Sequence, residues 1–305
     1  MSAAVARSEG WADAGADNAA ARTAAQPEGR FSGAIMSENA RGYVAVIPDI
    51  KRKSPKEGDL LRGRDPAEAA RRLAGFGAPV LSVVTEKENY GGSPELLRWI
   101  VRAVDVPVLR KDFITSEDML KETADLGAAA VLLICAVICG DGMLGKTGET
   151  GKSGMIGETR ESGMPGKTGR LGKLEKLYES ALRLGLEPLV EVHTAEEMEL
   201  AAALVAPGAS GARLIGINNR DILRLERDDG NSARTAALAA HAPAGSLIIS
   251  ESGIMSPEDA IAAAAAGANA LLIGTALWQA SNLERAYRSF RIKITNYKAQ
   301  STNEA

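Results

Sequence analysis

The sequence contains few of the residues that usually mark metal, redox or disulfide chemistry. Among its 305 residues there are two cysteines and two histidines. Cys135 and Cys139 share one apolar run, and neither a second cysteine pair nor a histidine stands near them. A zinc site needs several such ligands, so we interpret both residues as buried thiols and expect no bound metal.

The chain also lacks an excess of basic residues and any long apolar run. Its formal charge is -3 and its pI is about 5.7, whereas a nucleic-acid-binding protein usually carries a concentrated basic surface. Its longest apolar runs, such as residues 128–138, are too short to span a bilayer, and residues 1–30 have no apolar core of signal-peptide type. We therefore expect a cytoplasmic protein with no nucleic-acid or membrane partner.

What the sequence does contain is an alternation of short β-branched and apolar runs with longer stretches of helical pattern, typical of successive βα units. The eight predicted strands cover residues 43–50, 80–85, 107–110, 130–134, 188–192, 214–218, 247–250 and 270–273. Eight units over about 250 residues match a (β/α)8 TIM barrel, since open doubly wound sheets more often stop at about five or six strands. We predict an α/β fold with this barrel at residues 31–295, a disordered tail at 1–30 and a C-terminal tail at 296–305.

Helix signals stand between the predicted strands. Ser116 is a predicted N-cap, and Pro66 and Pro257 are placed for the first turn of a helix. Gly77 and Gly267 follow helical stretches, where glycine suits the left-handed conformation that ends a helix. The predicted helices include residues 65–76, 116–126, 194–205 and 256–266.

A glycine-rich tract interrupts the pattern after the fourth predicted strand. Glycine recurs at every third position from Gly142 to Gly172, except at Arg160. The tract is short and holds one proline, Pro165, so a collagen-like triple helix is not expected. We interpret residues 140–172 as a flexible, low-complexity insertion, because a βα loop can lengthen without disturbing the barrel core.

The tract also contains a match to a nucleotide-binding motif. Gly140, Gly145, Lys146 and Thr147 fit the P-loop pattern G-x-x-x-x-G-K-T. A P-loop must lead directly into a helix whose first amides meet the phosphates, whereas further glycines follow Thr147. We therefore expect no nucleotide triphosphate site here.

Polar residues close almost every predicted strand, at the end where a TIM barrel has its active site. A single Lys or Glu there would be an ordinary solvated charge, but charges gathered in the mouth of a closed barrel must pair or bind a ligand. These residues include Asp49, Lys51, Lys111, Glu191, Asn218, Arg220 and Glu251.

A phosphate site is predicted at the last two strands. Ser252 and Gly253 follow the seventh strand, and Gly274 and Thr275 follow the eighth. These loops commonly bind phosphate in this fold, and they offer hydroxyls and backbone N–H groups, to which Lys51 could add a cation. The sequence therefore indicates a phosphorylated small-molecule ligand.

Seven motifs, in order and in register, resemble the indole-3-glycerol phosphate synthase family, and one set of this size is far more specific than any single motif. The resemblance covers about residues 31–280, apart from the insertion. The motifs are Ile50-Lys-Arg-Lys-Ser-Pro, Leu81-Ser-Val-Val-Thr-Glu with Gly91-Gly92-Ser93, Pro107-Val-Leu-Arg-Lys-Asp-Phe-Ile, Leu189-Val-Glu-Val-His, Ile215-Gly-Ile-Asn-Asn-Arg-Asp, Ser250-Glu-Ser-Gly-Ile and Leu272-Ile-Gly-Thr.

The resemblance implies a carbon–carbon lyase of tryptophan biosynthesis that needs no cofactor. Lys111 would be the general acid at the carbonyl oxygen of the substrate, and Glu191 would handle protons during dehydration. The remaining implied roles are substrate positioning by Asn218, Arg220 and Glu251, substrate binding by Lys51 and Ser54, and phosphate binding by Ser252, Gly253, Gly274 and Thr275.

The sequence departs from the family at Asp49, where the family usually has the longer Glu. Catalytic geometry is sensitive to shifts of about 1 Å, so the role of this catalytic carboxylate could pass to another residue. Two other functions therefore stay open: a different phosphate-binding barrel enzyme, such as a sugar-phosphate isomerase, and a phosphate-binding relative that has lost catalysis. The sequence gives no signal for the oligomeric state.

Overall fold

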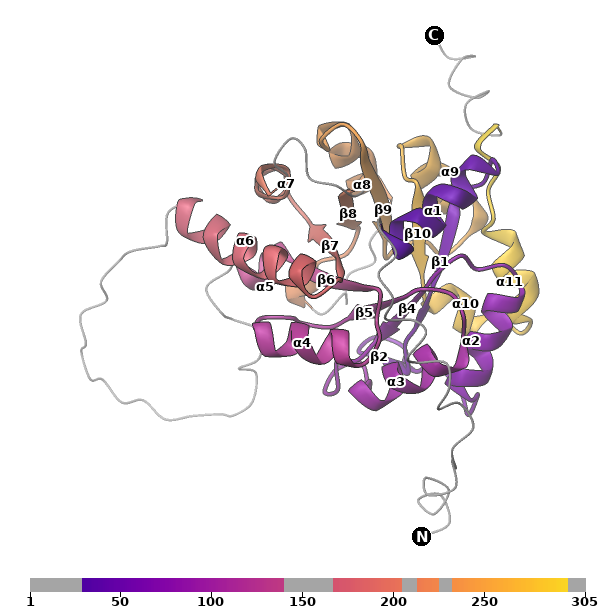
Figure 1. Cartoon of the computed structure of the whole chain (residues 1–305). Helices are drawn as coiled ribbons and strands as arrows, with labels where there is room; N and C mark the ends of the chain where they lie inside the picture. The colour runs from indigo at the N-terminus through magenta and orange to yellow at the C-terminus, as the bar shows by residue number, and fades with distance from the viewer. Residues whose placement is uncertain (1–28, 140–166, 205–212, 225–231, 296–305) are drawn as a thin grey trace, which may run out of the picture.

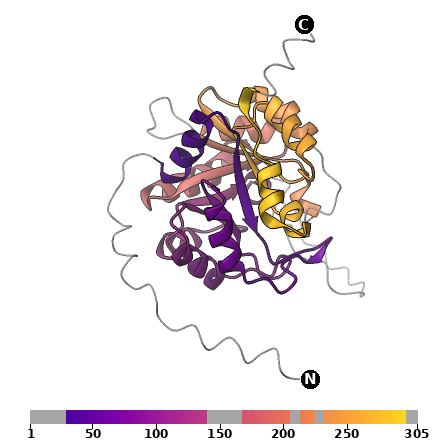
Figure 2. The same cartoon turned by 90° about the vertical axis from the view of Figure 1, so that its right-hand side faces the viewer.

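The computed structural model describes residues 29–139, 167–204, 213–224 and 232–295, and within them the chain forms the predicted barrel. Eight parallel strands close on themselves, with the first strand paired to the last. Figure 2 shows this closure as the indigo first strand beside the yellow C-terminal elements. The strands are β1 (Ala45–Ile50), β4 (Leu81–Val84), β5 (Val108–Lys111), β6 (Ala130–Ile134), β7 (Glu187–Val192), β8 (Arg213–Asn218), β9 (Ser246–Glu251) and β10 (Ala270–Ile273).

Helices surround the strands (Figures 1 and 2) and begin where the sequence signals predict. Ser116, Thr194 and Ser256 each accept a backbone N–H of the first helical turn. Gly77 and Gly267 have φ of 101° and 103°, which confirms the predicted left-handed helix ends. The helices are α1 (Arg30–Ala40), α2 (Pro66–Gly75), α3 (Pro94–Ala103), α4 (Glu117–Asp125), α5 (Cys135–Ile138), α6 (Lys167–Arg183), α7 (Ala195–Ala203), α8 (Ala233–Leu238), α9 (Pro257–Ala265), α10 (Thr275–Gln279) and α11 (Leu283–Ser289), with 3₁₀ turns η2 (Ile222–Arg224) and η3 (Ala239–His241).

The barrel interior is a packed apolar core below the polar mouth. Leu109, Leu132, Leu189 and Ile249 are among the side chains that fill it, each at most a few per cent exposed. The other faces of the strands pack against the surrounding helices, which explains why the strands are apolar along their whole length. Cys135 and Cys139 lie in this outer core and are buried, as predicted.

Helix α1 packs onto the interior core of the barrel. Its Phe31 and Ile35 are fully buried in the same cluster as the inward-facing side chains of the strands. The first turn has no cap from its own neighbours, because Gly29 occupies the N-cap position. The carboxylate of Glu187 on β7 takes that place and accepts N–H bonds from Phe31 (2.6 Å) and Ser32 (3.0 Å).

Replacing Glu187 tests this long-range cap. We expect Glu187→Ala to lower the free energy of unfolding by about 1–2 kcal/mol, because two helix N–H groups lose a charged acceptor. Thermal or urea unfolding measures the change. Glu258→Ala, which removes an exposed acid from the first turn of α9, is the control and should change stability by less than about 0.5 kcal/mol. Equal effects of both variants would contradict the capping role.

The structure adds two features to the predicted scheme. Residues 167–172, assigned above to the flexible insertion, belong to helix α6, which begins at Lys167. A two-stranded hairpin, β2 (Lys53–Ser54) with β3 (Gly58–Asp59), follows β1. Arg30, assigned to the predicted tail at residues 1–30, begins helix α1. Residues 1–28 of that tail, the predicted tail at 296–305, the rest of the insertion and the P-loop match lie outside the described residues. None of the helices in the described ranges is long and apolar enough to cross a membrane.

Candidate active site

Four of the predicted catalytic side chains meet in the barrel mouth, at the C-terminal ends of four different strands. Lys111 ends β5, Glu191 lies near the end of β7, and Asn218 and Glu251 end β8 and β9. Asn218 and Glu251 are direct neighbours in the register of their strands. Glu191, Asn218 and Glu251 are 0% exposed, so these polar groups face each other rather than solvent.

Lys111 links the two buried carboxylates. Its Nζ lies 3.1 Å from Oε2 of Glu191 and 2.9 Å from Oε2 of Glu251. Asn218 donates a further hydrogen bond of 3.2 Å from Nδ2 to Oε1 of Glu191. A buried carboxylate without a partner is strongly destabilising, so a single ammonium holds both acids in place and is itself held between them. The arrangement presents one proton donor beside two acceptors.

Asp49 lies on the opposite side of the mouth and is held by two neighbouring elements. Its Oδ1 accepts a hydrogen bond of 2.7 Å from Oγ of Ser82 on β4, and its backbone oxygen accepts one of 2.7 Å from Nε1 of Trp278. A Cβ at Gly274 would stand 3.4 Å from Oδ2 of Asp49, an ordinary contact distance. Ser82 therefore fixes the shorter carboxylate, and its signal in the sequence was a single polar residue in a fully buried strand.

An apolar cavity opens on one side of Lys111. Its volume, including space open to solvent, is about 330 Å³. Asp49, Lys51 and Lys111 form its polar edge, together with Glu86 and Asp112. The apolar lining comprises Val84, Tyr90, Phe113, Leu132, Ile134 and Ile222. A flat aromatic group with one charged substituent matches this combination.

A polar cavity of about 380 Å³, again including open space, lies on the other side. It shares Asp49, Lys51 and Lys111 with the apolar cavity, so these three residues stand at the junction of the two. The structure thus brings together all four predicted phosphate residues and Arg220. The other residues that line this cavity include Arg220, Ser252, Gly253, Gly274 and Thr275.

The loop after β9 has an unusual backbone, which the sequence did not predict. Ser252 and Gly253 have φ of 62° and 70°, and Ser252 and Arg62 are the two non-glycine residues with positive φ in the described chain. Asn219 holds the loop, because its Nδ2 donates to the backbone oxygens of Glu251 (3.0 Å) and Ser252 (3.1 Å). These two residues also line the polar cavity, so the turn brings the loop to its wall.

His193 extends the charged network behind Glu191. Its Nε2 lies 3.4 Å from Oε1 of Glu191, and its Nδ1 lies 3.2 Å from Oε2 of Glu197. Burial lowers the pKa of His193, but the hydrogen bond with Glu197 and the charge of Glu191 outweigh it, so the net pKa is raised above 6.5.

Two polar residues of the family motifs make contacts away from the two cavities. Ser54 is not among the residues that line the two cavities: its Oγ accepts the backbone N–H groups of Lys56 (3.3 Å) and Glu57 (3.4 Å) in the β2–β3 turn. Arg110, which precedes Lys111 in β5, points away from the mouth. Its guanidinium pairs with Glu122 on α4 at 2.8 Å, because adjacent strand residues face opposite sides.

The cation of Lys51 stands beside an aromatic ring. Its ammonium lies 5.6 Å from the centroid of the Tyr90 ring, at the edge of the apolar cavity.

Within the described residues there is no cluster of three His, Cys, Asp or Glu side chains that could hold a metal ion.

A family model and individual known proteins that resemble this chain carry the same description. A model of the family described as indole-3-glycerol phosphate synthase matches residues 4–149 and 170–290. The interval between these stretches falls in the glycine-rich tract. The chain is similar to the indole-3-glycerol phosphate synthases of Pyrococcus furiosus (38% identity, 80% of this chain, 90% of the relative), Pyrococcus abyssi (37%, 80% and 90%) and Deinococcus radiodurans (36%, 86% and 84%).

Proposed function

Because the chain belongs to the indole-3-glycerol phosphate synthase family, we propose that its barrel mouth carries out the reaction of that family. The substrate is 1-(2-carboxyphenylamino)-1-deoxyribulose 5-phosphate, and the product is indole-3-glycerol phosphate, formed with loss of CO₂ and water. The chain is accordingly a carbon–carbon lyase of tryptophan biosynthesis. The observation that carries the residue assignment is the position of Lys111, at the junction of the two cavities and between two buried carboxylates.

The two cavities match the two ends of this substrate. The carboxyphenyl ring fits the apolar cavity, where Phe113 and Leu132 offer apolar contacts and Lys51 a cation for the carboxylate. The phosphate fits the polar cavity, beside Ser252, Gly253, Gly274, Thr275 and Arg220. The ribulose chain then crosses the junction, and its ketone lies next to Lys111. This pose brings the ring carbon and the ketone carbon together inside the mouth.

Ring closure forms a bond between the ring carbon that bears the carboxylate and the ketone carbon. The ketone oxygen gains negative charge, and Lys111 donates a proton to it. The carboxylate then leaves as CO₂, and its bonding electrons restore the aromatic ring. In the dehydration that follows, Glu191 accepts a proton from the carbon beside the ring nitrogen, while the neighbouring hydroxyl takes up a proton and leaves as water. Asn218 positions the base Glu191 through a hydrogen bond, and Glu251 positions the acid Lys111 through an ion pair.

A turnover assay tests the proposed reaction. Purified full-length protein is mixed with the carboxyphenylamino-deoxyribulose phosphate, and indole fluorescence is followed. We expect product to form at a rate proportional to enzyme. Phosphate-ester binding without turnover would instead identify a relative that has lost catalysis, and isomerisation of a sugar phosphate would identify another barrel enzyme. Activity that appears only in Asp49→Glu would show that the shorter carboxylate had disabled the site.

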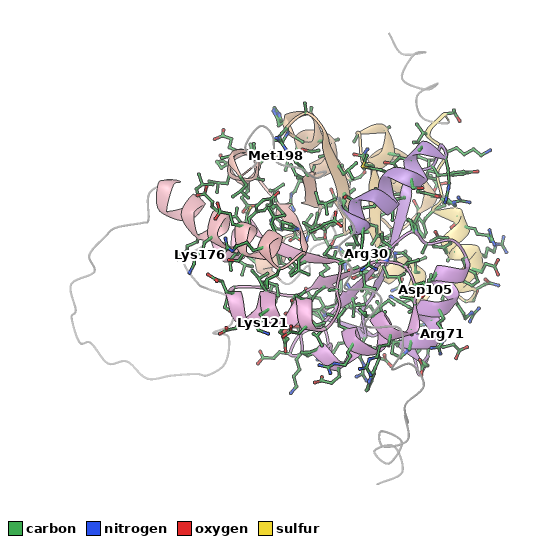
Figure 3. The ribbon with its side chains drawn as sticks, in the orientation of Figure 1. Arg30, Arg71, Asp105, Lys121, Lys176 and Met198 are labelled. Atoms are coloured by element: carbon green, nitrogen blue, oxygen red, sulfur yellow. The ribbon has the colours of Figure 1, made fainter. Side chains whose placement is uncertain are left out.

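Arg220 is predicted to act in substrate binding rather than in the chemical step. It lines the polar cavity and is 6% exposed. Loss of a charged hydrogen-bond donor costs about 1.5–3 kcal/mol, so Arg220→Ala should raise KM by about 10-fold to 100-fold and change kcat much less. Steady-state kinetics and competition by inorganic phosphate measure the effect. Arg71→Ala, on the exposed surface of α2 (Figure 3), is the control. A fall in kcat with KM unchanged would contradict this role.

A further inference from the structure

The ring of His193 stands between two glutamates, one in the candidate active site and one at its edge. Nε2 is 3.4 Å from Oε1 of Glu191, and Nδ1 is 3.2 Å from Oε2 of Glu197. Glu191 contacts Lys111 at 3.1 Å through its other oxygen. The side chains of Glu197, His193, Glu191 and Lys111 therefore form one continuous line of proton-carrying groups.

Local structure fixes the orientation of this ring. Thr194 is the N-cap of helix α7, and its Oγ1 accepts the N–H of Glu197. The carboxylate of Glu197 turns back toward β7 and accepts the backbone N–H of His193 at 2.6 Å as well as contacting its Nδ1. One nitrogen of the imidazole is thus tied to Glu197, which leaves Nε2 directed to the active site.

The groups of the line differ in exposure. The side chain of Glu191 is 0% exposed, that of His193 is 9% exposed, and that of Glu197 is 17% exposed. Nε2 of His193 is buried and has no aligned hydrogen-bond partner, although it lies at ion-pair distance from Glu191. Lys111, at 12% exposure, borders the two cavities, and Glu197 is the group through which the line can reach water outside them.

The charges around His193 favour its protonated form. Glu191 and Glu197 face it from β7 and α7, and Arg234 on α8 opposes them. From α5, the Cys135 thiol also faces the glutamates, but burial raises the pKa of Cys135 well above its ordinary value and keeps it neutral. The balance raises the pKa of His193, so an imidazolium is present at higher pH than for a free histidine.

The proposed reaction needs such a proton supply. Loss of CO₂ from a substrate carboxylate, together with loss of water, consumes one proton in each turnover. We propose, on the basis of the proposed function, that His193 and Glu197 deliver this proton from solvent to the Glu191–Lys111 pair. Nε2–H protonates Glu191, which passes the proton to Lys111 after Lys111 has acted as acid. The neutral imidazole left behind carries its remaining proton on Nδ1. Exchange with solvent moves that proton to Nε2, and Nδ1 then takes up a new proton through Glu197, which restores the imidazolium. His193 does not touch the substrate and is a positioning residue.

The pH dependence of kcat separates proton supply from a structural role. We expect kcat of the parent enzyme to fall as the pH rises through the pKa of His193, because the imidazolium is then lost. In His193→Gln, kcat should be lower by about 10-fold to 100-fold and should lack this descending limb. KM should change less than about twofold. Imidazole added to His193→Ala should restore part of the rate. His241→Gln, at an exposed position, is the control.

A measurement without substrate keeps the inference testable if the variants fold poorly or if the parent shows no turnover. The chain has two histidines, so NMR titration of the unmodified protein resolves His193 beside the exposed His241. The His193 midpoint should lie above 6.5 and should fall in Glu197→Gln but not in Glu196→Gln, an exposed control in the same helical turn. A parent enzyme without turnover would overturn the function alone. An unchanged midpoint in Glu197→Gln, or an unchanged descending limb in His193→Gln, would overturn the proton supply.

Discussion

Lys111→Met is expected to lower kcat by about 1,000-fold while the protein still binds its substrate, since positioned acid–base groups typically contribute between about 100-fold and 10,000-fold. Methionine keeps the unbranched apolar stem and removes the ammonium that contacts Glu191 and Glu251. The rest of both cavities is unchanged, so KM should change by less than about 10-fold. Stopped-flow or steady-state fluorescence of the indole product measures kcat, and titration with inorganic phosphate measures binding.

The same substitution at a surface lysine controls for unspecific effects. Lys121 on α4, labelled in Figure 3, is 66% exposed and pairs with Asp125 at 2.6 Å. Lys121→Met should leave kcat unchanged and alter stability by less than about 0.5 kcal/mol. Lys111→Met should in addition unfold more easily than the parent, because two buried carboxylates lose their counter-charge. A Lys111→Met variant that is stable, folded and fully active would contradict the assignment.

Gly216→Ala is expected to lower kcat/KM by about 100-fold, the loss typical of a displacement of about 1 Å at a catalytic group. Gly216 faces the barrel interior on β8, beside Glu191 in the strand register. A Cβ at this position would stand 2.1 Å from Oε1 of Glu251 and 3.5 Å from Cδ1 of Leu189. The carboxylate of Glu251 must therefore move, and we expect this movement to weaken the contact of its other oxygen with Lys111.

The cost in stability should accompany the loss of activity. Overpacking a buried site usually costs about 1–3 kcal/mol, which thermal unfolding resolves. Gly75→Ala is the matched control, since Gly75 ends helix α2 and a Cβ added there would have no atom within 4 Å. That variant should keep full activity and gain up to about 1 kcal/mol. If Gly216→Ala retained the activity of the parent, the Glu251 carboxylate would not need its present position.

The strands could be predicted from sequence because they are apolar on both faces and almost all of them end in polar residues. Strand β6 has the predicted bounds, and β7 and β8 each differ from prediction by one residue at one end. The helix caps Ser116 and Ser256 could also be predicted, because capping depends on neighbours within a few residues. Helix α1 was not predicted, since its cap is supplied by Glu187, distant in sequence.

The catalytic pairing could be predicted only in part. The ends of the predicted strands identified Lys111, Glu191 and Glu251 as candidates. The ion pair of Lys111 with Glu251 could not be predicted, because the two residues are 140 positions apart and the contact depends on side-chain conformation. The outward direction of Arg110 follows from the alternation of strand faces, because Arg110 precedes the inward-facing Lys111 in β5. Contacts between different strands, such as the hydrogen bond from Ser82 on β4 to Asp49 on β1, cannot be predicted from the spacing of residues within one segment.

The proposed catalysis requires one substrate that spans both cavities with Lys111 between its ends. A crystal structure of the protein with the reduced substrate, in which a hydroxyl replaces the reactive ketone, tests this most directly. The predicted result places the carboxyphenyl ring against Phe113, the phosphate beside Ser252 and Thr275, and Nζ of Lys111 within hydrogen-bond reach of the new hydroxyl. A phosphate bound outside the polar cavity, or a hydroxyl beyond the reach of Lys111, would contradict it.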